Sequence, residues 1–148
     1  MKDLKIFDEF IRKGIVKKQS PDKSRAEFLA KEAEQTYLNL LEMINKLGIK
    51  DKNANDYVRV CYAILTELVR AKMLLNGYNA SGFGAHEAEI SYLRNLGFKE
   101  NDVRFADQMR FFRNGMLYYG TILDKPYAEK VILFTKEKYS ELKKFINE

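Results

Sequence analysis

The stretch Asn101–Gly120, NDVRFADQMRFFRNGMLYYG, decides how this chain folds. Its large apolar side chains recur at intervals of four, three, four and three residues, which is the period of one face of an α-helix. They are Phe105, Met109, Phe112, Met116 and Tyr119. This spacing predicts a helix whose apolar stripe packs against other helices.

The same helix carries a second face that is polar and aromatic. Arg110, Arg113, Asn114 and Tyr118 lie on or beside this face, together with Leu117. Two arginines, an amide and a phenol cannot all be core residues, because a buried guanidinium needs a partner. The second face is therefore the candidate for function.

Helical periodicity and end signals predict the other helices. Ser20 and Pro21 pair a capping serine with a proline at the first helical position. The predicted helices run from residue 2 to 13, from Ser20-Pro21 to Gly48, from Asn53 or Asn55 to Asn76, from His86 to Leu96, and from Asp124 or Lys125 to the C-terminus. The third of these is apolar on most sides, so it has several neighbours or lines a subunit interface.

These elements predict an all-α fold. Short connections make sequential helices antiparallel, so we expect an up-down antiparallel four-helix bundle. A short extra helix lies between the second and third long helices, and an N-terminal helix precedes the bundle. Residues 1–148 form a single domain, with a core of about 21–147 and an N-terminal helix and polar link over 1–20. No strand is predicted.

Composition fits one domain with a real core, since 46% of the 148 residues are hydrophobic and 13% are aromatic. The 26 Lys and Arg residues exceed the 21 Asp and Glu residues, which gives a net charge of +5. This balance mildly favours anionic partners, although scattered surface lysines give the same total.

Several classes of protein do not fit the sequence. Cys61 is the one cysteine, so no disulfide can form within the chain, as is typical of the cytoplasm. We interpret Cys61 as a core residue rather than a nucleophile. No apolar run reaches the roughly 18 residues of a membrane span. The single histidine and the absence of a Cys/His cluster predict no metal site and no cofactor.

A glycine-rich loop, GYNASGFGA over 77–85, precedes His86. Gly82, Phe83 and Gly84 invite comparison with a phosphate-binding loop, but no predicted strand precedes them and the required spacings are absent. We interpret the segment as a tight connection. His86 then lies near a helix start, where it is either a capping or surface residue or a contact to a substrate.

The segment FFRNGMLYYGTILD, residues 111–124, resembles the end of the third bundle helix in HEPN domains, the higher-eukaryote and prokaryote nucleotide-binding family. The family pattern is an arginine, a polar residue and a histidine four to six positions along. Arg113 and Asn114 match this pattern, and Asp124 matches a later acidic residue more loosely. The layout of the segments SRAEFLAKEAE, YAILTELVRAKMLLNGY and HEAEISYL is also similar to that family.

The sequence departs from the family at the histidine, because Tyr118 and Tyr119 stand where it is expected. Active HEPN ribonucleases are metal-independent and use the histidine to manage the 2′-hydroxyl proton. Tyrosine, with a pKa of roughly 10, is a poor general base but can donate a hydrogen bond or stack on a base. The resemblance therefore implies a degenerate catalytic motif of Arg113, Asn114 and Tyr118.

Three hypotheses follow from these residues. The first is a HEPN-like homodimer that binds RNA or a nucleotide, with Arg110, Tyr119 and His86 as further substrate contacts, or that pairs with a nucleotidyltransferase in a toxin–antitoxin-like system. The second is a weak metal-independent ribonuclease that uses Arg113 with Tyr118 or His86. The third is a structural protein–protein adaptor. Against the first two stands a simpler reading, in which the arginines form salt bridges to Glu67 or Asp107.

Overall fold

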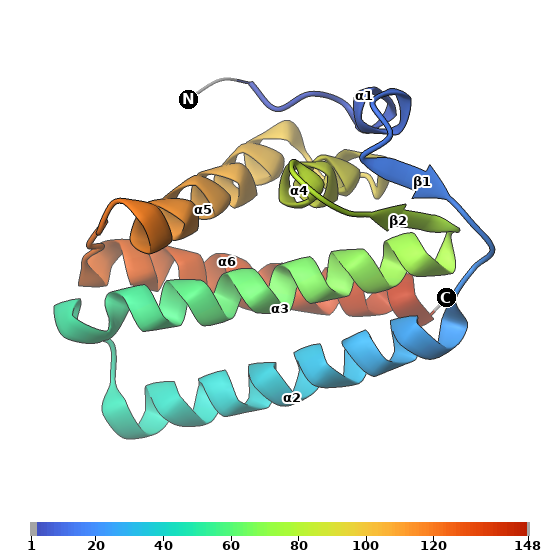
Figure 1. The fold of residues 1–148 in the computed structure, drawn as a ribbon. Helices are drawn as coiled ribbons and strands as arrows, with labels where there is room; N and C mark the ends of the chain where they lie inside the picture. Colours follow the sequence, from blue (N-terminus) through green and yellow to red (C-terminus); the bar gives the residue numbers. More distant parts are fainter. Residues whose placement is uncertain (1–2, 148) are drawn as a thin grey trace.

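Helix α3 (Ala54–Leu75) is buried on most of its sides, as its apolar composition predicts. A computed structural model describes residues 3–147 of the chain. Around α3 lie the helices α1 (Phe7–Arg12), α2 (Lys23–Leu47), α4 (Ala85–Asn95), α5 (Glu100–Tyr118) and α6 (Lys125–Asn147), with the short turn η1 (Asp51–Asn53) and the strands β1 (Val16–Lys18) and β2 (Tyr78–Ala80) (Figure 1). The all-α prediction is confirmed.

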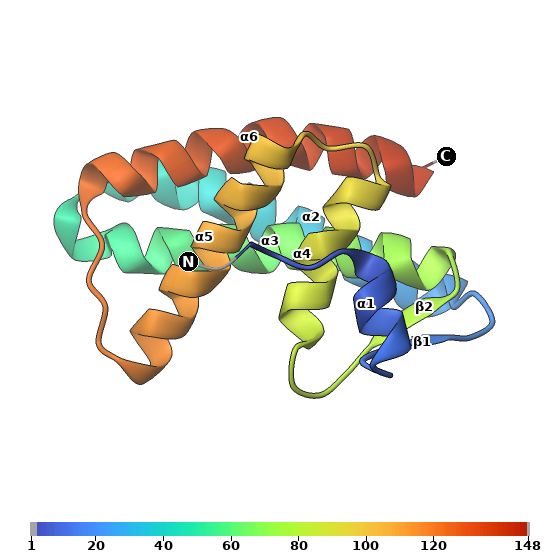
Figure 2. The ribbon, with the colours of Figure 1, turned by 90° about the horizontal axis from the view of Figure 1, so that it is seen from above.

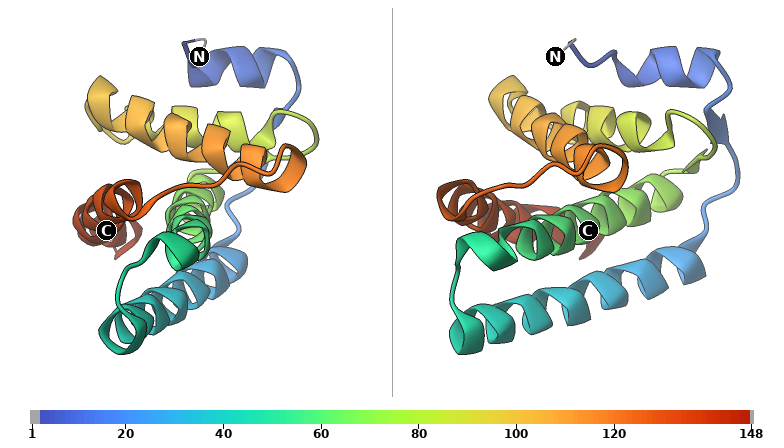
Figure 3. Two further views of the ribbon diagram at one scale, coloured as in Figure 1. Left: turned by 90° about the vertical axis from the view of Figure 1, so that its left-hand side faces the viewer. Right: turned by 60° about the vertical axis from the view of Figure 1, so that its left-hand side comes forward.

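The long helices fall into two groups that share α3. Helices α2 and α6 lie along α3, and α2 also meets α6 where the rings of Tyr37 and Tyr139 stack with centroids 3.8 Å apart. Helices α4 and α5 pack against each other and against α3, and they run across its direction (Figure 2). Figure 3, which shows α3 and its two companions nearly end-on, places α1 beyond α4 and α5.

This crossing leaves the predicted up-down four-helix arrangement unconfirmed. The predicted helices all exist, and the short α4 lies between α3 and α5 as expected. Apolar periodicity identifies which face of a helix is buried, but the crossing angle depends on how the side chains of two helices interdigitate. The sequence alone therefore could not predict the angle at which α5 crosses α3.

The N-terminal segment covers the outer side of α4. The Phe7 ring packs on the Tyr92 ring at 4.7 Å and on the Tyr78 ring at 5.2 Å. Arg94 donates hydrogen bonds to the carbonyl oxygens of Leu4 and Lys5, each at 2.8 Å. The predicted N-terminal helix therefore exists, although it is shorter than the predicted span 2–13, of which residue 2 lies outside the described part of the chain.

Two local predictions were wrong. The chain pairs β1 with β2 as a two-stranded antiparallel sheet, with Val16 opposite Ala80, where we predicted links without strands. Strands of three residues are too short to show alternation, so tertiary proximity creates them. Helix α2 begins two residues after Pro21, because the Asp22 carboxylate caps it by accepting from the Arg25 N–H at 3.1 Å.

The sheet brings the segment after β1 against Gly77, and this contact requires glycine. Gly77 has a φ of 81°, and its carbonyl accepts from the Gln19 N–H at 2.9 Å. A Cβ atom added at Gly77 would lie 2.7 Å from the Gln19 carbonyl oxygen, whereas one added at Gly14, with a φ of 75°, meets nothing within 4 Å. A larger residue at either position would adopt a strained backbone conformation, but only at Gly77 would its Cβ atom also clash with a carbonyl oxygen.

We therefore expect Gly14→Ala to lower the free energy of unfolding by about 1–2 kcal/mol, through backbone strain alone. Gly77→Ala should lose about 1–3 kcal/mol more, because a backbone carbonyl must also move. Urea denaturation of both variants measures the difference. Equal losses would show that the contact between Gly77 and Gln19 contributes nothing.

Candidate functional site

Arg110 is held by carboxylates. Its Nε donates to Asp107 Oδ1 at 2.7 Å, and its Nη1 lies 3.9 Å from Glu87 Oε1 on α4. Asp107 is only 3% exposed, so its charge needs this partner. The salt-bridge reading is thus confirmed for Arg110 with Asp107, while Glu67 pairs with neither arginine. The role of Arg110 in the structure is to neutralise the buried Asp107 carboxylate.

Arg113, one turn further along α5, has a different environment. Its guanidinium carbon lies 5.7 Å from the centroid of the Tyr62 ring, within the range of a cation–π interaction. Within residues 3–147, no carboxylate forms an ion pair with Arg113 and no acceptor receives a hydrogen bond from it. The side chain is half-buried, so the N–H donors of a half-desolvated guanidinium are left for a ligand.

His86 enters the same region from the first turn of α4. Its ring lies 6.0 Å from the Tyr62 ring, and its Nδ1 lies 3.4 Å from Glu89 Oε1. Arg113 and His86 are therefore both neighbours of the Tyr62 ring. The side chain of His86 is 45% exposed, which leaves part of the imidazole accessible to solvent.

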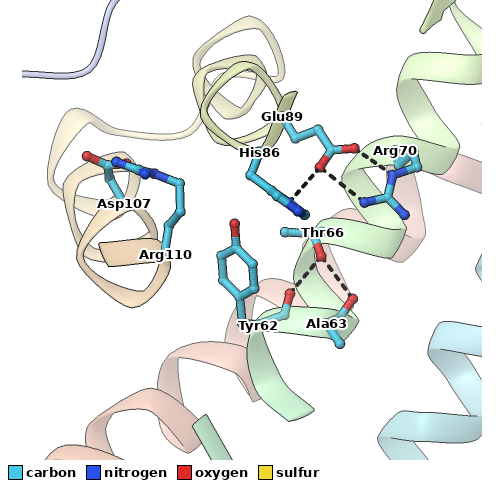
Figure 4. A network of polar contacts seen from close by, with 8 residues as sticks. All are labelled: Tyr62, Ala63, Thr66, Arg70, His86, Glu89, Asp107 and Arg110. Atoms are coloured by element: carbon cyan, nitrogen blue, oxygen red, sulfur yellow. Dashed lines mark hydrogen bonds and ion pairs between the residues drawn. The ribbon is translucent and has the colours of Figure 1, made fainter. Parts of the chain in front are cut away.

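Glu89 connects His86 to Arg70. It is 2% exposed and receives two hydrogen bonds from Arg70 on α3, from Nε at 2.5 Å and from Nη2 at 3.1 Å (Figure 4). Burial acts to raise the pKa of Glu89, but the neighbouring His86 imidazole and the hydrogen bonds from Arg70 outweigh it, and the net pKa lies below its ordinary value. A bidentate pair of this kind fixes α4 on α3.

Tyr62 completes the cluster with an unusual hydroxyl. The residue is 3% exposed, and its hydroxyl oxygen has no hydrogen-bond partner within the described chain. Figure 4 shows this hydroxyl directed between the side chains of Arg110 and His86. Burial raises the pKa of Tyr62 well above its ordinary value, so the phenol stays protonated and can only be a neutral donor or acceptor. We call Tyr62, Arg70, His86, Glu89 and Arg113 the α3–α4–α5 cluster.

The other predicted site residues lie outside this cluster. Asn114 follows Arg113 on α5 and is half-buried, without a side-chain hydrogen bond in the described part of the chain. Tyr118 is 74% exposed and Tyr119 is 86% exposed. The expectation that Tyr119 belongs to the apolar stripe is wrong, because α5 ends at Tyr118 and the next residue leaves the helical period.

Sequence reasoning missed Tyr62, Arg70 and Glu89. The available signal was Arg70, a cation on a helix that is apolar on most of its sides, since a partly buried cation favours a carboxylate partner. Glu89 lies three residues after His86, which places both on one face of α4. The contact of Tyr62 with Arg113 depends on helix packing and carries no local signal.

Cys61 is confirmed as a core residue. It is fully buried, and burial raises the pKa of its thiol to about 11, so the thiolate needed by a nucleophile is absent at neutral pH. Residues 3–147 contain no group of three or more His, Cys, Asp or Glu side chains that could hold a metal ion. Over the same residues, no helix is long and apolar enough to cross a membrane.

Comparison with protein-family models, with curated protein sequences and with solved structures found no significant match to this chain.

The Arg70–Glu89 pair yields a stability test. We expect Arg70→Met to lower the free energy of unfolding by about 3–5 kcal/mol, because it leaves the buried Glu89 carboxylate with only His86. The double variant Arg70→Met/Glu89→Leu should recover much of this loss, since no charge remains buried. Chemical denaturation at pH 7 measures both.

The same pair predicts acid sensitivity. Because the pKa of Glu89 is lowered in the folded state from 4.5, its stabilising effect is complete above pH 4.5 and is lost as pH falls through the lowered folded value. Glu89→Gln should therefore flatten the decline in stability below pH 4.5. An unchanged acid profile would mean that solvent reaches the carboxylate.

Proposed function

We propose that this chain is a HEPN-like dimeric binding module with a degenerate ribonuclease site, which holds RNA or a nucleotide at Arg113. In this proposal α2, α3, α5 and α6 correspond to the four bundle helices of that family. The observation that carries the proposal is the contrast between two arginines on one helix: Arg110 is ion-paired, and Arg113 rests on an aromatic ring without a carboxylate partner in residues 3–147.

This contrast favours an anionic ligand. A guanidinium that stacks on an aromatic ring keeps the N–H donors in its own plane, and these match the oxygens of a phosphodiester. The His86 imidazole lies beside the same Tyr62 ring, with ring centroids 6.0 Å apart, and adds a second donor. The exposed rings of Tyr118 and Tyr119 lie one to two turns along and suit stacking with unpaired bases.

An apolar surface at the end of α5 supports self-association. Several large side chains there are more than half exposed, namely Phe111, Leu117, Tyr118, Tyr119 and Ile122. Apolar groups gathered in this way mark interaction surfaces. Twofold pairing through this surface would bring two copies of Arg113 towards one cleft and double the positive field. A partner nucleotidyltransferase is the other occupant we propose, and the mass of the purified protein in solution separates the two.

We expect Arg113→Ala to weaken the binding of a fluorescein-labelled single-stranded RNA by roughly 10–100-fold at low salt, because the variant loses charge-assisted hydrogen bonds to phosphate. The slope of a plot of log K against log salt concentration should decrease in magnitude by about one, because one phosphate contact is lost. Fluorescence anisotropy over a salt series measures both quantities. Arg113→Lys should restore only part of the affinity, because lysine lacks the planar fork.

The matched control is Arg104→Ala. Arg104 is exposed on the same helix and its removal changes the net charge by the same amount. If Arg104→Ala and Arg113→Ala weaken RNA binding equally, the effect is general electrostatics and the proposed site is wrong. Absence of binding by the unaltered protein to RNA and to nucleotides would also contradict the proposal.

A second candidate function is a weak metal-independent ribonuclease, and the position of His86 favours it. Glu89 lies at Nδ1 of the imidazole, an arrangement that orients the ring and leaves Nε2 for a proton transfer. Tyr118, the other candidate, is largely exposed, and no hydrogen bond within residues 3–147 orients its side chain. We therefore place the proton-transferring role on His86 rather than on Tyr118.

This candidate predicts slow cleavage of single-stranded RNA in the presence of EDTA. His86→Ala should reduce the rate by about 10²–10⁴-fold, as expected for loss of a general base, while Tyr118→Phe leaves it unchanged. Gel analysis of end-labelled RNA measures the rates. Equal activity of His86→Ala and the unaltered protein would exclude this mechanism.

A further inference from the structure

A groove separate from the α3–α4–α5 cluster lies between the N-terminal segment and the helices α4 and α5. Its volume is about 520 Å³, within the roughly 300–1,000 Å³ typical of small-molecule sites. Apolar side chains form much of its lining, namely Leu4, Phe10, Ile15, Phe83 and Phe111. We call this space the N-terminal groove.

Two phenylalanines border the groove and remain exposed. Phe83 is 97% exposed at the tip of the glycine-rich loop, and Phe111 is 54% exposed on α5. The loop is held in place, because the Ser81 N–H donates to the Ile15 carbonyl at 3.0 Å and a Cβ atom at Gly84 would lie 3.0 Å from the Ile15 side chain. An exposed phenylalanine on a fixed loop gains stability only when something covers it.

The charges of the groove are unevenly divided. On the side of α4 and α5, Arg110 lies between Asp107 and Glu87, so these charges compensate one another. On the side of the N-terminal segment stand Asp3, Lys5 and Lys13, and neither lysine forms an ion pair within residues 3–147. Contact with the Lys5 ammonium and its positive charge lower the pKa of Lys13, so the two side chains repel each other.

We infer that the N-terminal groove binds a small organic anion with a flat apolar body, of the class of the aromatic carboxylates. The anionic group lies between Lys5 and Lys13 and relieves their repulsion. The ring lies against Phe83 and Phe111, where aromatic contacts add to the burial of apolar area. A free inorganic anion would satisfy the lysines but would leave both phenylalanines exposed.

A small molecule fits the groove better than a macromolecule. The groove also contains the carboxylates of Asp3, Glu87 and Asp107, and the successive phosphates of a polyanion such as RNA would meet them. The inference uses neither Arg113 nor any residue of the α3–α4–α5 cluster, and it shares only Phe111 with the apolar surface proposed for self-association.

The probe for the test is 2-naphthoate, titrated by isothermal calorimetry and by amide chemical shifts of the full chain. We expect the double variant Lys5→Ala/Lys13→Ala to weaken binding about tenfold, and Phe83→Ala to weaken it several-fold. The neutral isostere 2-naphthamide should bind the unaltered protein about as weakly as 2-naphthoate binds the lysine variant.

Two controls match these variants. Lys17→Ala/Lys18→Ala removes two exposed lysines from β1, and Phe28→Ala removes a phenylalanine that is 61% exposed on α2. Both should leave the affinity for 2-naphthoate unchanged. All the altered side chains are exposed, so these variants are expected to fold.

Three results would overturn the inference. One is equal affinity of the lysine variant and the unaltered protein for 2-naphthoate. Another is a change in solution mass caused by Phe83→Ala, which would show that a second copy of the chain covers the groove. The third is loss of RNA affinity in Lys5→Ala/Lys13→Ala as large as that in Arg113→Ala, which would make the groove part of the RNA surface. The second result would bear on the proposed homodimer and the third would support RNA binding, whereas the first leaves the proposed function untouched.

Discussion

The burial of α3 is the constraint on which the rest of the structure depends. This helix is apolar on most of its circumference, and such a helix is stable in water only when neighbours cover all of its sides. Helices α2 and α6 cover one part, and α4 and α5 cross over the other (Figure 2). Two of the polar residues of α3, Tyr62 and Arg70, consequently lie in the interface where the cluster forms.

The arginines in and beside that interface differ in whether a carboxylate neutralises them. Arg70 forms an ion pair with Glu89, and Arg110 forms one with Asp107. Each of these carboxylates is almost fully buried and therefore needs a cationic partner. Arg113 has only the face of Tyr62 as a partner. Arg110 and Arg113 lie one turn apart on α5, but only Arg110 is neutralised by a carboxylate in residues 3–147.

The helices were predictable because each carries local signals of period and termination. The cap at Asp124 is one example, since its carboxylate accepts from the Tyr127 N–H at 3.0 Å where the proline signal placed a helix start. The loop before that cap was unpredictable. Asn55 on α3 donates to the Thr121 carbonyl and accepts from the Leu123 N–H, contacts that span more than sixty residues. These bonds fix the path that leaves Tyr119 exposed rather than packed.

By itself, the sequence determined that this chain is all-α, where its long helices lie, and that the Arg110–Arg113 segment has a face unsuited to a core, because these properties follow from periodicity and local capping. Only the tertiary structure decided which arginine is neutralised, that His86 joins Arg113 around Tyr62, and that short strands pair near the N-terminus. The physical reason is that buried charges and strand pairing depend on partners far away in the sequence, and packing angles bring those partners together.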